Sequence, residues 1–265
     1  MIGAIIGDIV GSIYEWDNIK TKDFKLFDED CDFTDDTVMT LAVAKALVEW
    51  NRDGSLYSLK EKMIDIMHEC GKRYPDCGFG GHFADWIINK KRKPYGSYGN
   101  GSAMRVSSIG WFSNSLLEAE LLAKASSEIR HNHPDGIKGA QAVASAIYLA
   151  RTGKSIVEIK EYIKNKYYDI NFTLDEIRPT YKFDVTCKGS VPQALEAFFE
   201  SESFEDAIRN AISIGGDSDT IAAITGSVAE AYYGVDDDTI KIALSYLDDD
   251  LLSDYCQIKN KMGGI

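Results

Sequence analysis

Signals for the start of a helix recur along this sequence, and they constrain its fold more than any other feature. In residues 58–70, SLKEKMIDIMHEC, the apolar side chains repeat at the spacing of one helical face. These signals predict a chain that is built mainly from helices. Four serines stand three residues before an acidic residue, the capping-box pattern, with the last in a weaker form: Ser58–Glu61, Ser115–Glu118, Ser155–Glu158 and Ser203–Asp206.

Helical patterns cover most of the remaining chain, and convincing strand patterns are scarce. Only residues 179–186 suggest a short extended segment. The polar, glycine- and tyrosine-rich stretches 91–102 and 168–190 are typical of loops, and no low-complexity linker divides the chain. We therefore predict one all-α domain over residues 1–265. Its further helices are expected at residues 36–50, 81–90, 136–151, 191–200, 219–233 and 238–247.

The composition indicates a globular protein and argues against several classes of partner. Acidic residues outnumber basic ones by 42 to 29, which gives a formal net charge of −13. Nonspecific nucleic-acid binding and docking on anionic lipid both depend on lysine and arginine, so neither is expected. Five cysteines without a metal-site spacing are typical of reduced cytosolic thiols.

The apolar start of the chain, MIGAIIGDIVG, does not predict a signal peptide. It lacks a basic region, and Asp8 interrupts a run that is already short. No segment approaches the length of a transmembrane span. A cytoplasmic monomer is therefore the expectation.

Two short motifs with paired carboxylates lie far apart in the chain. TDDT, residues 34–37, and GGDSDT, residues 215–220, each lead into a strongly apolar helical segment. Aspartate and threonine are common N-caps, so helix capping is one explanation. Four aspartates that converged at buried helix ends would repel one another unless a cation neutralised them. Oxygen-rich clusters suit Mg²⁺, Mn²⁺ or Ca²⁺, so capping and a hard-metal site both stay open.

These two motifs belong to a series of five that together resemble one known family. The others are GDIVGSIYE at residues 7–15, GNGSAMR at 99–105 and HNHPDGIKGAQAVA at 131–144. In this order they resemble the ADP-ribosylglycohydrolase family, which includes the dinitrogenase reductase-activating glycohydrolases. The resemblance implies an all-α fold with a cleft for two divalent cations, Mg²⁺ or Mn²⁺. It also implies hydrolysis of the bond between the anomeric carbon of ADP-ribose and an acceptor, such as a protein arginine.

The resemblance further implies roles for individual residues. The cations would be held by Thr34, Asp35, Asp36, Asp217, Asp219 and Thr220. Glu15 would lie near the cations and the reacting sugar, and Glu15, Asp35 and Asp36 are the candidates for catalytic proton transfer. The substrate would be bound by Asn100, Gly101, Ser102 and His133.

The glycine-rich loop at residues 99–102 is the candidate for contact with the diphosphate. Backbone N–H groups at a helix start bind phosphate well, which matters in a protein of net negative charge. Tyr95 and Tyr98 flank this loop and are candidates for stacking on adenine. Arg105, one turn into the helix, is the nearest fixed cation and fits a structural role equally well.

Other interpretations fit the same residues. The protein could bind ADP-ribose without turnover, as a sensor or an immunity protein. It could also be a dimetal hydrolase of a free ADP-ribose derivative, or a helical scaffold whose aspartates are only caps. Turnover in the presence of metal would distinguish an enzyme from a protein that only binds ADP-ribose. An effect of chelators on stability would distinguish a metal protein from a helical scaffold. The expected partner is an ADP-ribosylated protein or a small ADP-ribose derivative.

Overall fold

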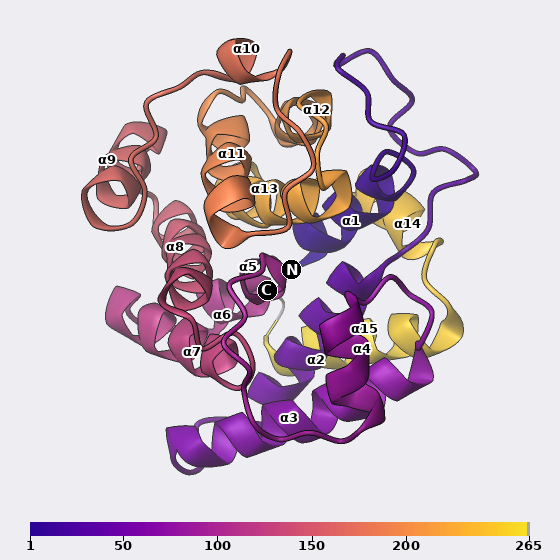
Figure 1. Cartoon of the computed structure of the whole chain (residues 1–265), viewed down its shortest axis with the longest axis vertical. Coiled ribbons are helices and arrows are strands. Elements are labelled where there is room, and N and C mark those ends of the chain that lie inside the picture. Colours follow the sequence, from indigo (N-terminus) through magenta and orange to yellow (C-terminus); the bar gives the residue numbers. More distant parts are fainter. Residues whose placement is uncertain (264–265) are drawn as a thin grey trace.

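Helix α13, Ser218–Tyr233, forms the centre of the fold. The computed structural model describes residues 1–263, and all twelve residues from Ser218 to Ala229 are buried within it. The main neighbours of α13 are α1, α8, α11 and α12 (Figure 1). An apolar stretch such as IAAITGSVA can occupy this position because it presents no charged side chain to its neighbours.

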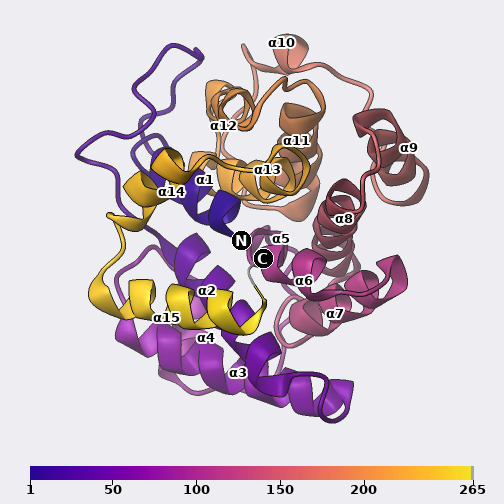
Figure 2. The ribbon, with the colours of Figure 1, turned by 180° about the vertical axis from the view of Figure 1, so that it is seen from behind.

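The described residues form fifteen helices in a single domain. Their bounds are α1 Ile2–Ser12, α2 Asp35–Trp50, α3 Leu56–Arg73, α4 Gly81–Ile88, α5 Gly101–Met104, α6 Ser107–Phe112, α7 Leu116–Glu128, α8 Pro134–Arg151, α9 Ile156–Lys166, α10 Leu174–Ile177, α11 Cys187–Phe199, α12 Phe204–Ser213, α13 Ser218–Tyr233, α14 Asp237–Leu244 and α15 Asp249–Lys261. Helices α3 and α15 both pack on α2 and form the opposite half of the molecule (Figure 2). None of the helices described is long and apolar enough to cross a membrane.

Helix α1 lies directly against α13, and small residues make this contact possible. A Cβ atom at Gly7 would overlap the Ala222 carbonyl, and one at Gly3 would overlap the carbonyl of Gly226. The two backbones therefore touch where a larger side chain would hold them apart. At the first turn of α13, the backbone of Asp219 likewise lies against Gly11 of α1.

The predicted helices are confirmed, with small shifts at their ends. The helix expected at 136–151 begins at Pro134, and the one expected at 191–200 begins at Cys187 and includes Pro192. The complete capping box at Ser155–Glu158 is present, and Ser115 and Ser203 also cap helices.

Three of the local predictions are wrong. The stretch 168–190, expected to be a loop, contains α10 and the first residues of α11. The cap of α3 is Ser55 and not Ser58, because the Ser55 hydroxyl accepts the backbone N–H of Ser58. Residues 179–186 form no strand, and the single bridge there joins Thr186 to Gly99. An extended segment without a paired neighbour cannot complete a ladder of hydrogen bonds.

Helix α1 is not predicted from the sequence, because a charged residue interrupts its apolar run. The helix continues through Asp8, which is fully buried. A buried carboxylate is tolerated when hydrogen bonds satisfy it, and the partners of Asp8 lie in the functional site.

Candidate metal centre and active site

The N-terminal ends of α2 and α13 bring the two aspartate motifs together. Thr34 caps α2 and accepts the backbone N–H of Asp36 over 3.3 Å. Asp217 occupies the corresponding position before α13. Thr220 Oγ1 donates a hydrogen bond to Asp36 Oδ2 over 3.0 Å, so the motifs meet in space although 184 positions separate these residues. Because carboxylates are stabilised at the positive ends of helices, both helix starts favour negative charge here.

Asp8 of α1 accepts hydrogen bonds from the start of α2. Its Oδ2 accepts the backbone N–H of Thr34 over 2.9 Å and that of Thr37 over 3.0 Å. Its Oδ1 accepts the hydroxyl of Thr34 over 2.6 Å. These three bonds fix the start of α2 relative to α1, and therefore relative to α13.

Two groups of carboxylates have the spacing of metal ligands. Ligand oxygens of Asp8, Asp36 and Asp219 all lie within 4.8 Å of one another, and so do those of Glu15, Asp217 and Asp219. Asp219 belongs to both groups, so the groups are adjacent. Asp36, Asp217 and Asp219 are buried, whereas Glu15 is half-buried at the edge.

Burial and mutual repulsion raise the pKa of these carboxyl groups. Burial, followed by the charges of Asp219 and Asp8, holds the pKa of Asp36 well above its usual range. Asp35 and Asp219 are shifted in the same direction, again chiefly by burial. Burial raises the pKa of Asp217 to about 6. Negative charge is therefore costly in this cluster in the absence of a cation.

The donor set fits a hard divalent cation. Asp36 Oδ1 is buried without a hydrogen-bond partner, an uncommon state for a carboxylate oxygen. Carboxylate and hydroxyl oxygens are the ligands that Mg²⁺ and Mn²⁺ prefer. Among the predicted ligands, Thr34, Asp36, Asp217, Asp219 and Thr220 converge directly. Asp35 lies close enough that the charge of Asp219 raises its pKa, but its oxygens are in neither close group.

Glu15 borders the cluster where it opens to solvent. Burial and the charges of Asp219 and Asp8 raise the pKa of Glu15 to about 7. Near neutral pH such a carboxyl group populates both of its protonation states. Glu15 is therefore suited to proton transfer in this geometry.

Two asparagines support the cluster from outside. Asn100 Nδ2 donates to Asp217 Oδ2 over 2.6 Å and to Ser190 Oγ over 3.0 Å. Asn18 accepts the Gly216 N–H over 2.7 Å and donates to the Gly216 carbonyl over 2.9 Å. This pair of bonds fixes a loop in which Gly216 has φ of 87°, a conformation that favours glycine. Outer partners of this kind orient metal ligands.

None of the other predicted substrate residues, all of which the structure describes, hydrogen-bonds to a carboxylate of the cluster. The Ser102 hydroxyl is buried and donates to the Gly136 carbonyl over 2.8 Å, so it is used within the fold. His133 caps α8 by accepting the backbone N–H of Asp135 over 3.1 Å. Its ring lies edge-on to Tyr98, with 5.4 Å between ring centroids. Gly101 begins α5, and the nearest atoms to a Cβ there belong to His131.

Sequence reasoning missed Asp8, Asn18 and the position of His131. Asp8 could have been recognised as the only charged residue in an otherwise apolar helical run. His131, which is buried, lies behind the glycine-rich loop, and burial and Arg105 hold its pKa well below the usual range. Arg105 itself donates to the carbonyls of Gly101 and Ser126 over 2.8 Å, which is a structural role. No local pattern marks Asn18.

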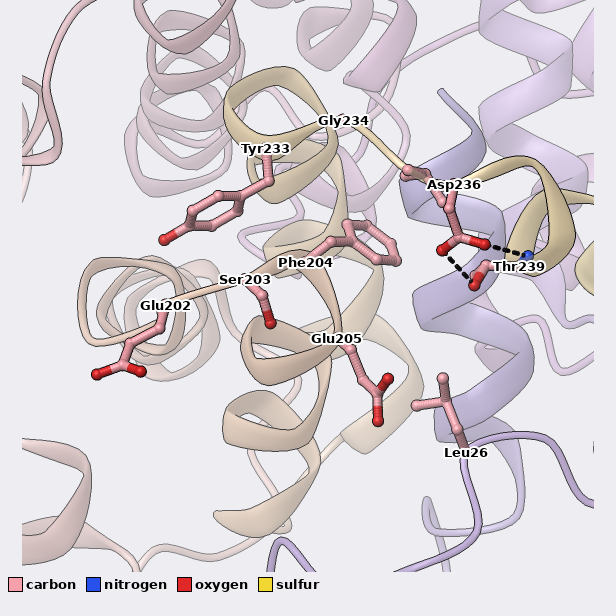
Figure 3. Close-up of a pocket in the computed structure, with 10 residues that line it drawn as sticks. Leu26, Glu202, Ser203, Phe204, Glu205, Tyr233, Gly234, Asp236 and Thr239 are labelled. Carbon is pink, nitrogen blue, oxygen red and sulfur yellow. Dashed lines mark hydrogen bonds between the residues drawn. The ribbon is translucent and has the colours of Figure 1, made fainter.

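A surface pocket of about 610 Å³ lies elsewhere, between α12 and the start of α14 (Figure 3). None of its lining residues belongs to the carboxylate cluster. Its Asp236 carboxylate caps α14 by accepting the N–H and hydroxyl of Thr239. The acidic groups of this pocket are thus explained by helix capping and solvent exposure, and we assign it no role.

Comparisons with known proteins agree with the fold and identify a family. The family model "ADP-ribosylglycohydrolase" matches residues 1–249. ADP-ribosylhydrolase ARH3 of Homo sapiens is 26% identical, over 89% of this chain and 85% of that protein. ADP-ribosylarginine hydrolase Tri1 of Pseudomonas putida (strain GB-1) is 25% identical, over 89% and 70% respectively. A solved "ADP-ribosylglycohydrolase-related protein complex" shares the fold, with a TM-score of 0.64, 19% identity and coverage of 98% and 97%. The chain therefore belongs to the ADP-ribosylglycohydrolase family of hydrolases.

Proposed function

We propose that this protein hydrolyses the bond between the anomeric carbon of ADP-ribose and an arginine side chain, and that it needs two divalent cations, Mg²⁺ or Mn²⁺. The observation that carries the proposal is the convergence of Glu15, Asp36, Asp217 and Asp219 on one partly open cluster. Similarity to a relative named ADP-ribosylarginine hydrolase supports arginine as the acceptor.

The predicted ligands Thr34, Asp35, Asp36, Asp217, Asp219 and Thr220 would hold the cations. When bound, divalent cations polarise sugar and water oxygens and lower the pKa of water. The same carboxylates provide negative potential beside the anomeric carbon, where positive charge develops in an oxocarbenium-like transition state. The chain therefore supplies both the ligands and the electrostatic stabilisation.

Glu15 is our candidate for moving the proton. Water adds to the anomeric carbon as the bond from that carbon to the guanidine nitrogen breaks. The substrate guanidinium group is protonated, so the electron pair of the breaking bond leaves with nitrogen and gives a neutral guanidine. A Glu15 carboxylate oxygen accepts a proton from the water, and Glu15 passes a proton to the leaving guanidine, which regenerates the carboxylate. The products are ADP-ribose and a protonated arginine side chain, so atoms and charge balance. A carboxyl group with a pKa of about 7 suits this exchange.

Diphosphate binding belongs in this proposal to the glycine-rich loop before α5. Gly99 and Gly101 leave little side-chain bulk there, and Tyr98 is exposed beside it. We propose that backbone N–H groups of this loop contact the diphosphate and that Tyr98 stacks on adenine. His133, edge-on to Tyr98, would then orient the tyrosine ring.

Release of ADP-ribose from an arginine-ADP-ribosylated protein tests the function. The assay is run with Mg²⁺, with Mn²⁺ and with EDTA, and in parallel on a serine-linked substrate and a free O-acetyl derivative of ADP-ribose. We expect metal-dependent release from the arginine-linked substrate. Release only from the O-acetyl derivative would identify a hydrolase of small molecules. No release at all, together with tight ADP-ribose binding by calorimetry, would identify a binding protein without turnover.

A further inference from the structure

An exposed aromatic pair borders the carboxylate cluster. Trp16 is 80% exposed and Phe183 is 42% exposed. Their rings stack with 5.2 Å between centroids and 24° between planes. Val185, which is 50% exposed, extends the same apolar segment. Exposed apolar groups that contact one another across two loops form a patch, and such patches mark contact sites more often than single exposed residues do.

Both loops that carry the pair are fixed to the loop that carries Asp217. On one side, Asn18 bonds to both backbone groups of Gly216. On the other side, the Tyr181 ring covers Gly216 so closely that a Cβ there would overlap it. The Tyr181 hydroxyl also donates to the Gly189 carbonyl over 2.7 Å. The position of the pair relative to the cluster is therefore set by the fold.

The pair is adjacent to the candidate proton-transfer residue. Trp16 directly follows Glu15, whose carboxylate lies within 4.8 Å of ligand oxygens of Asp217 and Asp219. A sugar whose anomeric carbon faces these carboxylates has its leaving group at the open side of the cluster. Trp16 follows Glu15, the half-buried member of the cluster, and both Trp16 and Phe183 are exposed to solvent. In the complex that we infer, the acceptor side chain extends from the sugar toward these rings.

The chemistry around the pair favours a cation. Asp17 follows Trp16, Phe183 lies between Lys182 and Asp184, and the chain as a whole has a net charge of −13. The nearby ammonium group of Lys20 is bound to the carbonyls of Tyr181 and Ile214, so it is not directed at the rings. Indole is the best aromatic partner for a cation, and guanidinium stacks on aromatic faces particularly well. A serine acceptor offers neither the charge nor the planar group.

We propose that Trp16 and Phe183 hold the guanidinium group of an arginine acceptor and so favour arginine-linked over serine-linked ADP-ribose. This inference rests on the proposed function, because it concerns the leaving group of that reaction. It assigns the pair a role in substrate specificity. Because the Trp16 side chain also hydrogen-bonds to Glu15 and lowers the pKa of that carboxyl group, Phe183→Ala is the cleaner test of specificity alone.

Steady-state kinetics on arginine-linked and serine-linked substrates, with the same cation, test the inference. The variants are Trp16→Ala, Trp16→Leu, Trp16→Phe and Phe183→Ala, and the matched control is Tyr57→Ala, an aromatic on α3 that is 72% exposed. We expect Trp16→Ala and Phe183→Ala to lower kcat/KM for the arginine-linked substrate about five- to tenfold, mainly through KM. The serine-linked value should change less than about twofold, since no cation–π contact is lost. Trp16→Phe should keep most of the wild-type kcat/KM for the arginine-linked substrate, whereas Trp16→Leu should lose about as much as Trp16→Ala.

Several results would overturn the inference. Equal losses on both substrates would mean that the pair only shapes the cleft, and full activity of Trp16→Leu would mean that apolar area alone matters. A wild-type preference for the serine linkage would overturn the specificity while leaving the hydrolase function intact. A wild-type protein that cleaves neither linkage would remove the proposed function, and this inference with it. Inhibition by free ADP-ribose should be equal in wild type and variants, because the product lacks the acceptor.

Discussion

The hydrogen bond from Thr220 Oγ1 to Asp36 Oδ2, 3.0 Å long, joins the two aspartate motifs of this chain. It occupies one carboxylate oxygen and leaves Asp36 Oδ1 buried without a partner. A buried carboxylate oxygen without a hydrogen bond destabilises the folded state unless a cation occupies the space beside it. Removal of the charge of Asp36 should therefore lower activity without lowering the stability of the metal-free protein.

Asp36→Asn should abolish most of the activity without destabilising the metal-free protein. The amide keeps the shape of the side chain and removes one of several mutually repelling charges. Loss of a cation ligand should lower kcat/KM by roughly 100-fold or more, since bound cations contribute several kcal/mol to such reactions. Thermal unfolding of the variant in EDTA should occur at the wild-type temperature or higher.

The matched control for that variant is Asp238→Asn, which makes the same change on the exposed first turn of α14. Its activity should stay within about twofold of wild type, as expected for a surface substitution away from the site. Near-normal turnover by Asp36→Asn at low metal concentration would refute the assignment of Asp36 as a ligand.

Asp36 and Asp8 show which part of this site can be predicted from sequence and which part cannot. Asp36 lies in a motif of four polar residues before an apolar helix, so its chemistry is visible locally. Asp8 lies inside an apolar run, and its function depends on Thr34 and Thr37, which approach only after folding. Local patterns identify helices and their caps, whereas long-range hydrogen bonds have no periodicity in the sequence.

The same distinction applies to the glycine-rich loop. The motif GNGSAMR predicts a helix start, and α5 begins at Gly101 as expected. The sequence does not reveal that the Ser102 hydroxyl faces inward or that Asn100 bonds to Asp217. Which side of a short helix faces the core is decided by the packing of α8 and α11 around it.

Asn100→Ala should weaken metal binding. Its amide donates to Asp217 Oδ2 over 2.6 Å, and outer partners of metal ligands typically contribute 10- to 100-fold in affinity or activity. We expect the Mg²⁺ concentration at half-maximal activity to rise by roughly tenfold or more. Asn171→Ala, on the exposed segment after α9, is the control. An altered KM with unchanged metal affinity would instead show that Asn100 acts on the substrate alone.

Metal-free protein should become less stable as the pH rises through the range between about 4.5 and 7. The pKa of Glu15 is about 7 in the folded state, against an ordinary value of 4.5, and that of Asp217 is about 6, against 3.8. The folded state therefore binds more protons than the unfolded state in this range, so the free energy of unfolding falls with rising pH.

Thermal unfolding with EDTA and with saturating Mg²⁺, at steps across that range, checks this prediction. The stabilisation by Mg²⁺ should grow with pH, because cations compete with protons for the same oxygens. The difference between the two series cancels the contribution of distant groups. Glu15→Gln should reduce the pH dependence of the EDTA series. A stabilisation by Mg²⁺ that is independent of pH would contradict the raised pKa values.

Gly7→Ala should disrupt the contact that brings Asp8 to the cluster. A Cβ at this position would overlap the Ala222 carbonyl of α13, and neither backbone can move without shifting a buried helix. Forcing extra volume into a packed interior typically costs about 1–3 kcal/mol, and occasionally more. The midpoint of urea unfolding should fall accordingly, and the affinity for Mg²⁺ should fall with it.

The control is Gly81→Ala, where a Cβ meets nothing within 4 Å. It should leave the unfolding midpoint and the Mg²⁺ affinity unchanged or raise the midpoint slightly. A Gly7→Ala protein with wild-type stability but weakened metal binding would mean that α1 orients Asp8 without contributing to the stability of the core.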